Sequence, residues 1–284
     1  MIEIRIDDYN SKDLDLYART REVDLYHLNE PDLGVFVAES PKVIERALDS
    51  GYEIESILVE EGRDNPDTAD GEILSRVLEK IDRMEKEGKL SNIFYFKAST
   101  AVLSKIKGFN MTRGALAIVK RRELPALSDV LKGAKRIAVM DEVVNPTNLG
   151  AIFRSAAALH MDAVVMTSNC TDPLYKRAIR VSMGNVFNIP WTIVPADESW
   201  VEELKRYDFS LAALALDEDS ISISDPILKM KERLALVLGN EGNGLPLSTI
   251  KSCDHTVMIP MSEGVDSLNV AAASAVAFWE ITRE

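Results

Sequence analysis

The sequence predicts an α/β protein with two domains: a larger C-terminal domain on a mainly parallel sheet and a smaller N-terminal α/β domain. From about residue 135 onward, continuous apolar runs alternate regularly with helical patterns. This alternation is typical of a parallel sheet that helices cover on both faces. Before residue 120, short apolar runs and amphipathic helices follow one another less regularly. The basic, proline-containing stretch at 120–125 lies between the two patterns and predicts a boundary, with domains at residues 1–122 and 123–284.

In the N-terminal domain, short apolar runs bounded by polar residues predict strands. These runs cover residues 35–38, 57–59, 93–96 and 115–119. A helix is expected over residues 41–50, because Pro41 suits a first helical turn and Gly51 suits a helix end. A second helix is expected over residues 71–87, where apolar residues recur at helical spacing.

In the C-terminal domain, five apolar runs predict the strands of the parallel sheet, at residues 137–140, 163–166, 211–216, 234–238 and 257–259. The helices between them are expected near residues 149–160, 173–183, 199–206 and 267–282. Ligands of open α/β sheets bind beyond the C-terminal ends of the strands. The loops that follow these strands are therefore the places to search for a functional site.

Composition excludes several classes of protein. With 46% hydrophobic and 28% charged residues, the chain can bury a sizeable core. It has no run of about eighteen apolar residues, and its first residues are neither basic nor apolar, so we expect no membrane span and no secretory signal. Cys170 and Cys253 lie far apart, outside any metal-binding spacing. They are interpreted as two free core thiols of a cytoplasmic protein that needs no metal.

The net charge of −13 is unfavourable for a protein that binds a polyanion. Residues 88–122, however, contain no Asp or Glu. The basic residues of this stretch are Lys89, Lys97, Lys105, Lys107, Arg113, Lys120, Arg121 and Arg122. They form either a local phosphate-contacting patch or a solvated face with a charged linker, and the sequence leaves both interpretations open.

The first loop of interest, residues 141–150, follows the first strand of the C-terminal domain and runs into a helix that carries Arg154. Asn148 could cap this helix, whose free N–H groups would favour an anion. Arg154 is surrounded in the sequence by small apolar residues, and a guanidinium offers a planar fork of donors that matches phosphate. The alternative is an ordinary surface arginine.

Two further loops follow later strands. Residues 239–246 form a glycine-rich turn whose glycines fit neither a dinucleotide fingerprint nor a P-loop, so taken alone this turn is a weak signal. Residues 259–270 lead into a helix rich in small residues, and Ser267 could serve there as an ordinary N-cap. The small residues at 271–277 would let another backbone pack closely.

Taken together and in this order, these segments resemble the SpoU (TrmH-like) family of the SPOUT class of RNA methyltransferases. The matches are N-x-G-x-x-x-R at Asn148, Gly150 and Arg154; G-x-E-x-x-G at Gly239, Glu241 and Gly244; and I-P-M followed by S-L-N-V at 259–261 and 267–270. Residues 180–190 resemble the connecting segment of the family, and the likeness spans about residues 135–284. The N-terminal domain resembles more weakly the L30e-like substrate-binding domain. Glu263 and Ala271 depart from the usual glycine and serine.

The resemblance implies a mainly parallel sheet whose C-terminal part forms a deep trefoil knot, a homodimer through the knotted domain, and S-adenosylmethionine as co-substrate. It also implies a set of cofactor-binding residues, with mainly backbone contacts to the adenosine part. That set is Leu238, Gly239, Asn240, Gly244, Ile259, Met261, Leu268 and Asn269.

The implied activity is 2′-O-ribose methylation of RNA. Arg154 would contact the hydroxyl or its neighbouring phosphate; because arginine stays protonated in proteins, a phosphate clamp is easier to explain than a base. Asn148, Ser267 and Asn269 would orient the hydroxyl and the loops, and Glu241 would fix the loops or position Arg154. Ribosomal RNA is favoured over transfer RNA by the L30e-like part. A non-catalytic RNA-binding protein with the same fold, and an α/β enzyme acting on a small nucleotide, are the alternatives.

Overall fold

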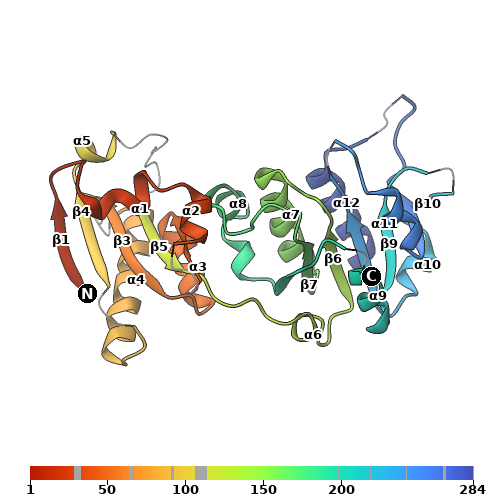
Figure 1. Cartoon of the computed structure of the whole chain (residues 1–284), viewed down its shortest axis with the longest axis horizontal. Coiled ribbons are helices and arrows are strands. Elements are labelled where there is room, and N and C mark those ends of the chain that lie inside the picture. The colour runs from red at the N-terminus through yellow and green to blue at the C-terminus, as the bar shows by residue number, and fades with distance from the viewer. Residues whose placement is uncertain are drawn as a thin grey trace. The chain divides into compact units, whose positions relative to one another are not determined.

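The computed structural model describes residues 1–28, 33–63, 67–90, 93–105, 114–197, 199–217, 219–240, 242–264 and 267–283. The chain forms two compact units. The first comprises Met1–Glu123 and Leu174–Phe187, and the second comprises Leu124–Pro173 and Asn188–Glu284. Each unit has its own sheet (Figure 1).

The described part of the first unit contains a mixed sheet in the order β1-β4-β3-β5-β2. Its strands are β1 (Ile2–Ile6), β4 (Phe94–Ala98), β3 (Ile54–Glu60), β5 (Ala115–Lys120) and β2 (Val35–Glu39). β1, β4 and β3 are parallel, whereas β5 runs antiparallel to both β3 and β2. β1 was not predicted from the sequence, because its alternation of isoleucine with charged residues covers only five positions.

Helices cover both faces of this sheet. α3 (Pro41–Asp49) and α4 (Ala69–Lys86) pack against each other on one face. The short helices η1 (Lys12–Leu14), α1 (Asp15–Ala18), α2 (Glu22–Tyr26) and α5 (Thr100–Leu103) contribute to the core on the other face. Capping hydroxyls fix where the long helices begin: Ser40 accepts from the N–H of Val43, and Thr68 from that of Gly71. The predicted helices at 41–50 and 71–87 are confirmed within two residues at each end.

The segment Leu174–Phe187, which the sequence assigned to the C-terminal domain, packs with the first unit. It forms α8 (Lys176–Val181) and η2 (Asn185–Phe187). The ring of Phe187 stacks on Phe36 of β2, and the Ser50 hydroxyl donates to the Phe187 carbonyl at 2.8 Å. A division at a single chain position does not describe this arrangement, because a segment from within the second half of the chain completes the core of the first unit.

The second unit is built on a sheet whose described strands are all parallel, in the order β10-β12-β9-β11-β6-β7-β8. The strands are β6 (Arg136–Met140), β7 (Ala163–Thr167), β8 (Trp191–Val194), β9 (Ser210–Leu214), β10 (Ile221–Ser222), β11 (Leu234–Leu238) and β12 (His255–Met258). This confirms the predicted α/β fold with a mainly parallel sheet. A trefoil knot means that one segment of the chain passes through a loop formed by another. The strand order alone does not establish this, so the predicted deep trefoil knot stays a prediction.

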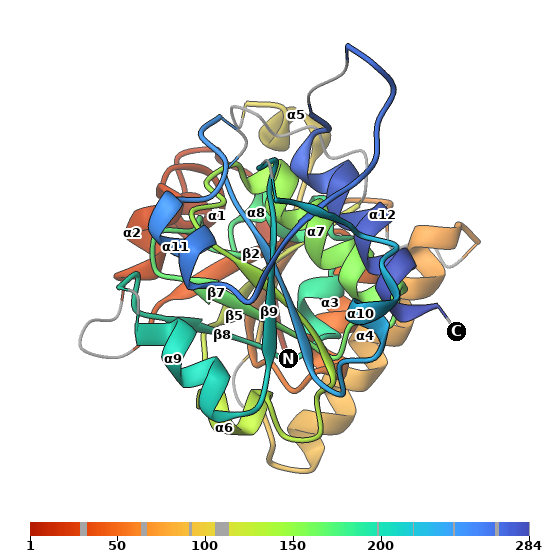
Figure 2. The same ribbon diagram turned by 90° about the vertical axis from the view of Figure 1, so that its right-hand side faces the viewer.

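Helices cover this sheet on both faces, which its fully buried central strands require. α7 (Pro146–Ala158) and α12 (Val270–Thr282) pack together on one side, and α6 (Leu127–Val130) and α9 (Ser199–Arg206) lie on the other (Figure 2). α10 (Pro226–Lys229) contacts α12, and α11 (Leu247–Ser252) leads into β12. None of the helices in the described ranges is long and apolar enough to cross a lipid bilayer.

Two predicted helix caps are wrong. α7 begins at Pro146 and is capped by Asn145, whose Oδ1 accepts from the N–H of Thr147 at 2.8 Å. Asn148 therefore lies inside the first helical turn, where proline already occupies the position that follows the cap. α12 is capped by Asn269 in place of Ser267, with Oδ1 accepting from the N–H of Ala271 at 2.9 Å.

Candidate functional site

A pocket of about 380 Å³ opens at the C-terminal ends of β9, β11 and β12. Its volume lies within the range of small-molecule sites, roughly 300–1,000 Å³. The residues around it come from the β9 end, the 239–246 loop, the 259–270 loop and the start of α12. They are Leu214, Ala215, Leu216, Leu238, Gly239, Asn240, Gly242, Asn243, Gly244, Val257, Met258, Ile259, Met261, Ser267, Leu268, Val270 and Ala273.

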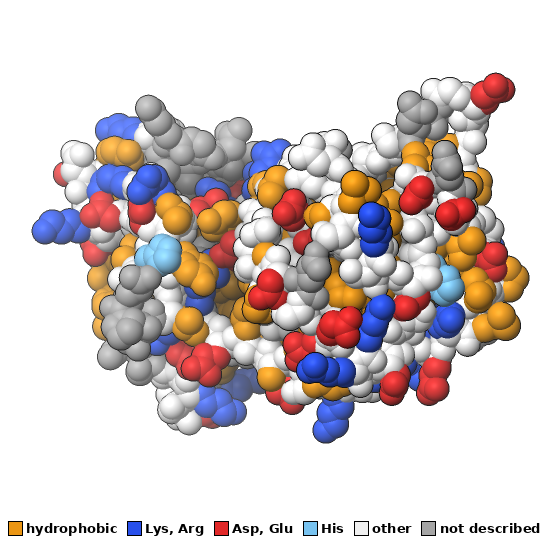
Figure 3. Space-filling view, turned by 45° about the vertical axis from the view of Figure 1, so that its right-hand side comes forward, with side chains coloured by type: hydrophobic (Ala, Val, Ile, Leu, Met, Phe, Trp, Pro, Cys, Tyr) orange, Lys and Arg blue, Asp and Glu red, His pale blue; other side chains and the backbone are white. Residues whose placement is uncertain are grey.

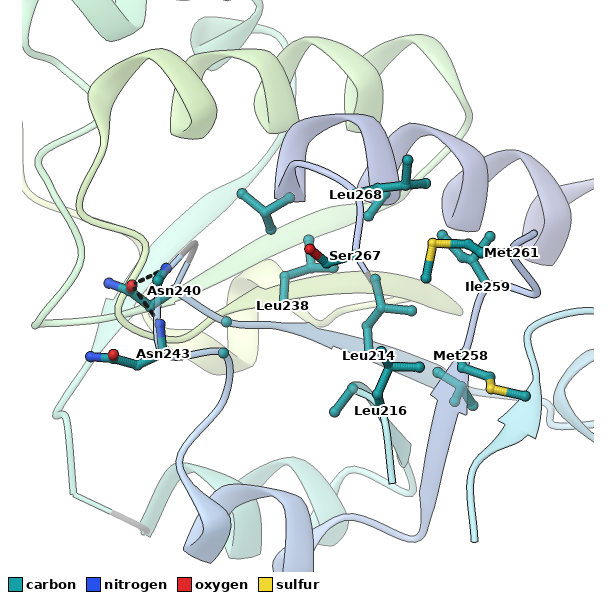
Figure 4. Close-up of a pocket in the computed structure, with 17 residues that line it drawn as sticks. Leu214, Leu216, Leu238, Asn240, Asn243, Met258, Ile259, Met261, Ser267 and Leu268 are labelled. Atoms are coloured by element: carbon teal, nitrogen blue, oxygen red, sulfur yellow. Dashed lines mark hydrogen bonds between the residues drawn. The ribbon is translucent and has the colours of Figure 1, made fainter. Parts of the chain in front are cut away.

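The described residues that line this pocket carry no charge. Figure 4 shows Asn240 and Asn243 at one end, Met258 and Met261 at the other, and Leu238 and Ser267 between them. Such a pocket binds its ligand through apolar contacts, backbone groups and a few amides and hydroxyls. It suits a ligand that combines apolar surface with a few polar groups.

The glycine turn has a defined shape, because its backbone closes on itself. The N–H of Asn240 donates to the carbonyl of Gly244 at 3.1 Å, and the N–H of Gly244 donates back at 3.0 Å. A Cβ at Gly239 would lie 2.6 Å from the backbone of Gly244 and Leu245, so only glycine fits there. Gly244 has a φ of +69°, which residues with a side chain rarely adopt.

The Asn240 side chain holds this turn together and joins it to the first loop. Its Oδ1 accepts from the N–H of Gly242 at 2.8 Å, and its Nδ2 donates to the carbonyl of Glu142 at 3.1 Å. The amide is thus used within the protein on both sides, so we assign Asn240 a positioning role at the pocket rather than a side-chain contact with a ligand.

Asn148 and Asn269, which are 121 residues apart, are brought together. The Nδ2 of Asn269 donates to the Oδ1 of Asn148 at 3.2 Å, while the Oδ1 of Asn269 caps α12. Asn148 is buried and does not line the pocket. The pair fixes the start of α12 to the first turn of α7, and with it the position of Ser267 and Leu268.

The sequence did not predict a buried carboxylate at the C-terminal edge of the same sheet. Asp141, at the end of β6, is 6% exposed. Its two oxygens accept hydrogen bonds at 3.0 Å from Thr167 at the end of β7 and from Thr249 of α11. Its N–H donates to the carbonyl of Leu238 at 2.9 Å, so Asp141 joins the ends of three strands and the helix after the glycine turn.

Cys170 lies close to this carboxylate, with its Sγ 3.2 Å from the carbonyl of Met140. Burial raises the pKa of the Cys170 thiol, and the pKa of the Cys253 thiol is raised by burial to about 12. Both thiols therefore stay protonated at neutral pH and are poor nucleophiles. Both cysteines are free, as the sequence predicted.

Arg154 and Glu241 are placed differently from the other candidate residues. Arg154 lies in the middle of α7, exposed, outside the pocket lining. Six residues along a helix place Arg154 about 9 Å further along the axis than Asn148 and about 120° away around it, so the two point to different faces. Glu241 lies outside the described residues, as does part of the third loop, and their predicted roles stay predictions.

Three lysines of the basic stretch at 88–122 are paired with acidic residues, whereas Lys105 is exposed and has no ion pair among the described residues. Lys89, Lys97 and Lys120 each pair with an acidic residue, at 2.7, 3.3 and 3.1 Å. Arg121 and Arg122 lie over the rings of Tyr26 and Tyr52. Lys107 and Arg113 lie outside the described residues. Acidic side chains are interspersed with basic ones across the face seen in Figure 3.

Residues 214–216 also line the pocket, and the sequence analysis did not single them out. They lie at the end of β9 and just after it, and β9 lies beside β11 in the sheet although β10 and α10 separate the two strands in the chain. Their apolar character is a weak signal by itself. Only the strand order reveals that they face the glycine turn.

Comparison with known proteins identifies close relatives. The SpoU rRNA Methylase family matches residues 135–279. An uncharacterized tRNA/rRNA methyltransferase of Mycobacterium bovis is 42% identical over 190 residues, which is 66% of this chain and 66% of that protein, or about two thirds of its length. The 23S rRNA (guanosine-2′-O-)-methyltransferase RlmB of Xanthomonas campestris is 27% identical over 237 residues, covering 81% of this chain and 89% of that protein.

Solved structures share the fold. The AdoMet-bound rRNA methyltransferase of Sinorhizobium meliloti has a TM-score of 0.79 at 23% identity, covering 98% of this chain and 97% of that one. An RNA 2′-O ribose methyltransferase has a TM-score of 0.72 at 24% identity, covering 98% of each chain. At this identity, the likeness establishes the fold.

The Asn148–Asn269 hydrogen bond predicts coupling between two distant substitutions. Asn269→Ala should cost about 0.5–2 kcal/mol through the lost cap. Asn269→Asp keeps the cap and loses only the donor to Asn148. In a double-mutant cycle, the effects of Asn148→Ala and Asn269→Ala on the free energy of unfolding should couple by about 0.5–1.5 kcal/mol.

Tryptophan fluorescence during urea denaturation measures the second unit alone, because the tryptophans of the chain, Trp191, Trp200 and Trp279, all belong to it. Strictly additive effects would show that the two side chains do not interact.

Proposed function

We propose that this chain, which belongs to the SpoU rRNA methylase family, transfers a methyl group from S-adenosylmethionine to a ribose 2′-hydroxyl of RNA. The observation that carries the proposal is the pocket itself. Two loops that bear the family's motifs, residues 239–244 and 259–268, are separated in the chain by α11 and β12, and described residues of both line one pocket of suitable size. The names of two similar proteins describe the same reaction: one is a 23S rRNA (guanosine-2′-O-)-methyltransferase and the other is an RNA 2′-O ribose methyltransferase.

The lining fits this co-substrate. The leucine and methionine side chains offer apolar surface for an adenine ring, and the backbone of Gly239, Ile259 and Leu268 offers hydrogen-bonding groups to its polar edges. The Ser267 hydroxyl is exposed and lies between the two ends of the pocket. When bound, the co-substrate would supply an electrophilic methyl group: the O–CH3 bond forms as the carbon–sulfur bond breaks, the thioether leaves, and the hydroxyl proton passes to water. The protein supplies placement of the two reactants.

Arg154 is proposed to hold the RNA rather than the methyl donor. Its side chain is exposed, and no hydrogen bond or ion pair within the described ranges involves its guanidinium. An exposed, uncommitted guanidinium is free to bind a phosphate next to the target ribose with two parallel hydrogen bonds. Because arginine is protonated throughout the physiological pH range, we assign it this role and not that of a base. Asn148 and Asn269 position the loops.

Ribosomal RNA is the proposed substrate, with transfer RNA as the alternative. Relatives are described as 23S rRNA methyltransferases, whereas the mycobacterial relative is described as acting on either class. The first unit is proposed to be an L30e-like substrate-binding domain, and the second to carry the knot. A protein with this substrate works in the cytoplasm.

A homodimer is proposed from the outer face of α12. Ala272, Val276 and Trp279 recur there at helical spacing, and Val276 and Trp279 are 45% and 58% exposed. Exposed apolar side chains in a contiguous stripe mark a surface that a partner covers. A second copy of this chain fits because the stripe is self-complementary in character and continuous with the packed pair of α7 and α12.

The activity predicts transfer of label from tritiated S-adenosylmethionine to RNA. Methylation of the 2′-oxygen blocks alkaline cleavage of the adjacent phosphodiester bond, so the label should appear in alkali-resistant dinucleotides from the ribosomal RNA fraction. Gly239→Ala should abolish the transfer and weaken donor binding in calorimetry at least about tenfold, because its Cβ would clash with the turn. Gly88→Ala, in open space at a positive φ in the other unit, is the control. Donor binding without any label in RNA would favour the non-catalytic alternative.

The proposed phosphate clamp predicts a specific effect of Arg154→Lys. Lysine keeps the positive charge and loses the planar fork, so methyl transfer should fall by at least about tenfold. Binding of S-adenosylmethionine should stay unchanged, since Arg154 does not line the pocket. Arg206→Lys, an exposed arginine on α9, is the matched control. Normal transfer by Arg154→Lys would remove this residue from the active site.

The dimer predicts that Trp279→Ser shifts the protein from dimer to monomer, because an apolar ring at the interface is replaced by a small polar group. Light scattering coupled to size-exclusion chromatography measures the mass. Leu247→Ser removes a comparably exposed apolar side chain, 72% exposed on α11, and should leave the dimer intact. A monomeric parent protein at micromolar concentration would contradict the proposal.

A further inference from the structure

We propose that the first unit contains a second binding site, a cavity that receives one unstacked nucleobase of single-stranded RNA; this inference rests on the proposed function, which makes RNA the substrate. The cavity has a volume of about 500 Å³ and lies between η1 and α1 on one side and the ends of β3, β4 and β5 on the other. It is separate from the methyl-donor pocket, and its lining belongs wholly to the first unit.

An aromatic ring at the cavity provides a platform for a base. Phe94, at the start of β4, is 40% exposed, although most phenylalanines of the chain are buried. Its ring is nearly parallel to that of Phe96, with an angle of 8° and centroids 6.0 Å apart. Phe96 is buried and packs edge-on against Tyr17. The exposed ring is thus held in place on a strand, and stacking of a base on such a ring needs little further ordering.

Two hydroxyl groups in the cavity provide polar contacts for the base. The Tyr17 and Ser56 oxygens are 2.6 Å apart and both side chains are buried. One of the two hydroxyl hydrogens lies between them, and the backbone of Ile118 also hydrogen-bonds the Tyr17 hydroxyl. The second hydroxyl hydrogen and the Ser56 oxygen are left for a ligand. Burial raises the pKa of Tyr17, so its phenol stays protonated. A donor and an acceptor close together match the edge of a nucleobase.

The charges around the cavity favour a single nucleotide over a run of phosphates. Lys12 is exposed and makes no ion pair in the part of the chain that is described, so it can meet one phosphate. Lys120 is already paired with Glu53 at 3.1 Å. Asp13 and Glu55 also line the cavity and oppose an approach by several phosphates. The expected salt dependence is therefore shallow, because each phosphate contact to a single strand contributes a slope of only about −0.7.

RNA is the ligand that fits this cavity, because a stacking ring, a hydroxyl pair and one free ammonium together match a nucleotide. A protein side chain inserted into the cavity would use the ring and leave the ammonium and hydroxyls unmatched. That alternative predicts that RNA binding is indifferent to Phe94, which the following experiment measures.

The experiment uses the full chain and a short single-stranded RNA whose uridines are replaced by 5-iodouridine. Irradiation should cross-link the RNA to Phe94, as identified by mass spectrometry of the digested adduct. In fluorescence anisotropy with the unmodified RNA, Phe94→Leu should raise the Kd at least about fivefold, because leucine cannot stack. Phe94→Trp should restore binding to within about twofold of the parent protein, since it keeps a stacking ring.

Controls separate this site from general damage. Val23→Ala removes a comparably exposed side chain, 44% exposed on α2, and should leave the Kd unchanged. The duplex form of the same RNA should not respond to Phe94→Leu, since its bases are paired. Cross-links that lie only elsewhere, or a Phe94→Leu protein that binds the single strand normally, would overturn the proposal.

Parallel assays keep the two proposals distinct. Donor binding and methyl transfer by the parent protein test the catalytic function without reference to Phe94. If the parent protein methylates RNA while Phe94→Leu binds RNA normally, the nucleobase site is wrong and the proposed function stands. If the parent protein transfers no methyl group and still cross-links at Phe94, the nucleobase site stands and the proposed activity fails.

Discussion

The arrangement of the second unit depends on one buried carboxylate, that of Asp141. It accepts hydrogen bonds from Thr167 and Thr249, and its own N–H bonds the carbonyl of Leu238. A carboxylate that is 6% exposed would be costly without such partners, so its position determines theirs. These bonds hold together the ends of β6, β7 and β11 and the helix after the glycine turn, and Leu238 at the end of β11 lines the pocket.

Close packing and hydrogen bonds connect this C-terminal edge of the sheet to the pocket. The turn after β11 closes tightly enough that Gly239 has no room for a Cβ, and Asn240 links that turn to the backbone of Glu142. Asn269 makes a similar link from the third loop: its side chain caps α12 and donates a hydrogen bond to Asn148 of α7. Two asparagine amides thus connect the first loop to the loops that line the pocket. None of the described residues of the first loop lines the pocket, so this loop contributes through these bonds.

The sequence predicted the features that depend on local pattern and missed those that depend on distant pairing. Continuous apolar runs predicted the central strands of the parallel sheet, because such runs are needed only where both faces are buried. The motif residues of the two pocket loops were found as well. The caps were misassigned because Asn145 and Asn148, and likewise Ser267 and Asn269, are equally good cap residues within one turn of each other. The bond from Asp141 to Thr249 spans 108 residues, and no local pattern marks either partner.

The acidic character of the chain constrains how it can recognise RNA. Lys89, Lys97 and Lys120 are paired with Glu87, Glu3 and Glu53, so these three lysines of the basic stretch contribute little free positive charge. Non-specific binding to nucleic acid comes almost entirely from free positive charge. A protein with little of it discriminates through stacking, hydrogen bonds and shape. If RNA is the substrate, its binding energy must then come from a few uncommitted groups, of which Arg154 and the ring of Phe94 are the described examples. The affinity for RNA that is not the substrate should accordingly be low.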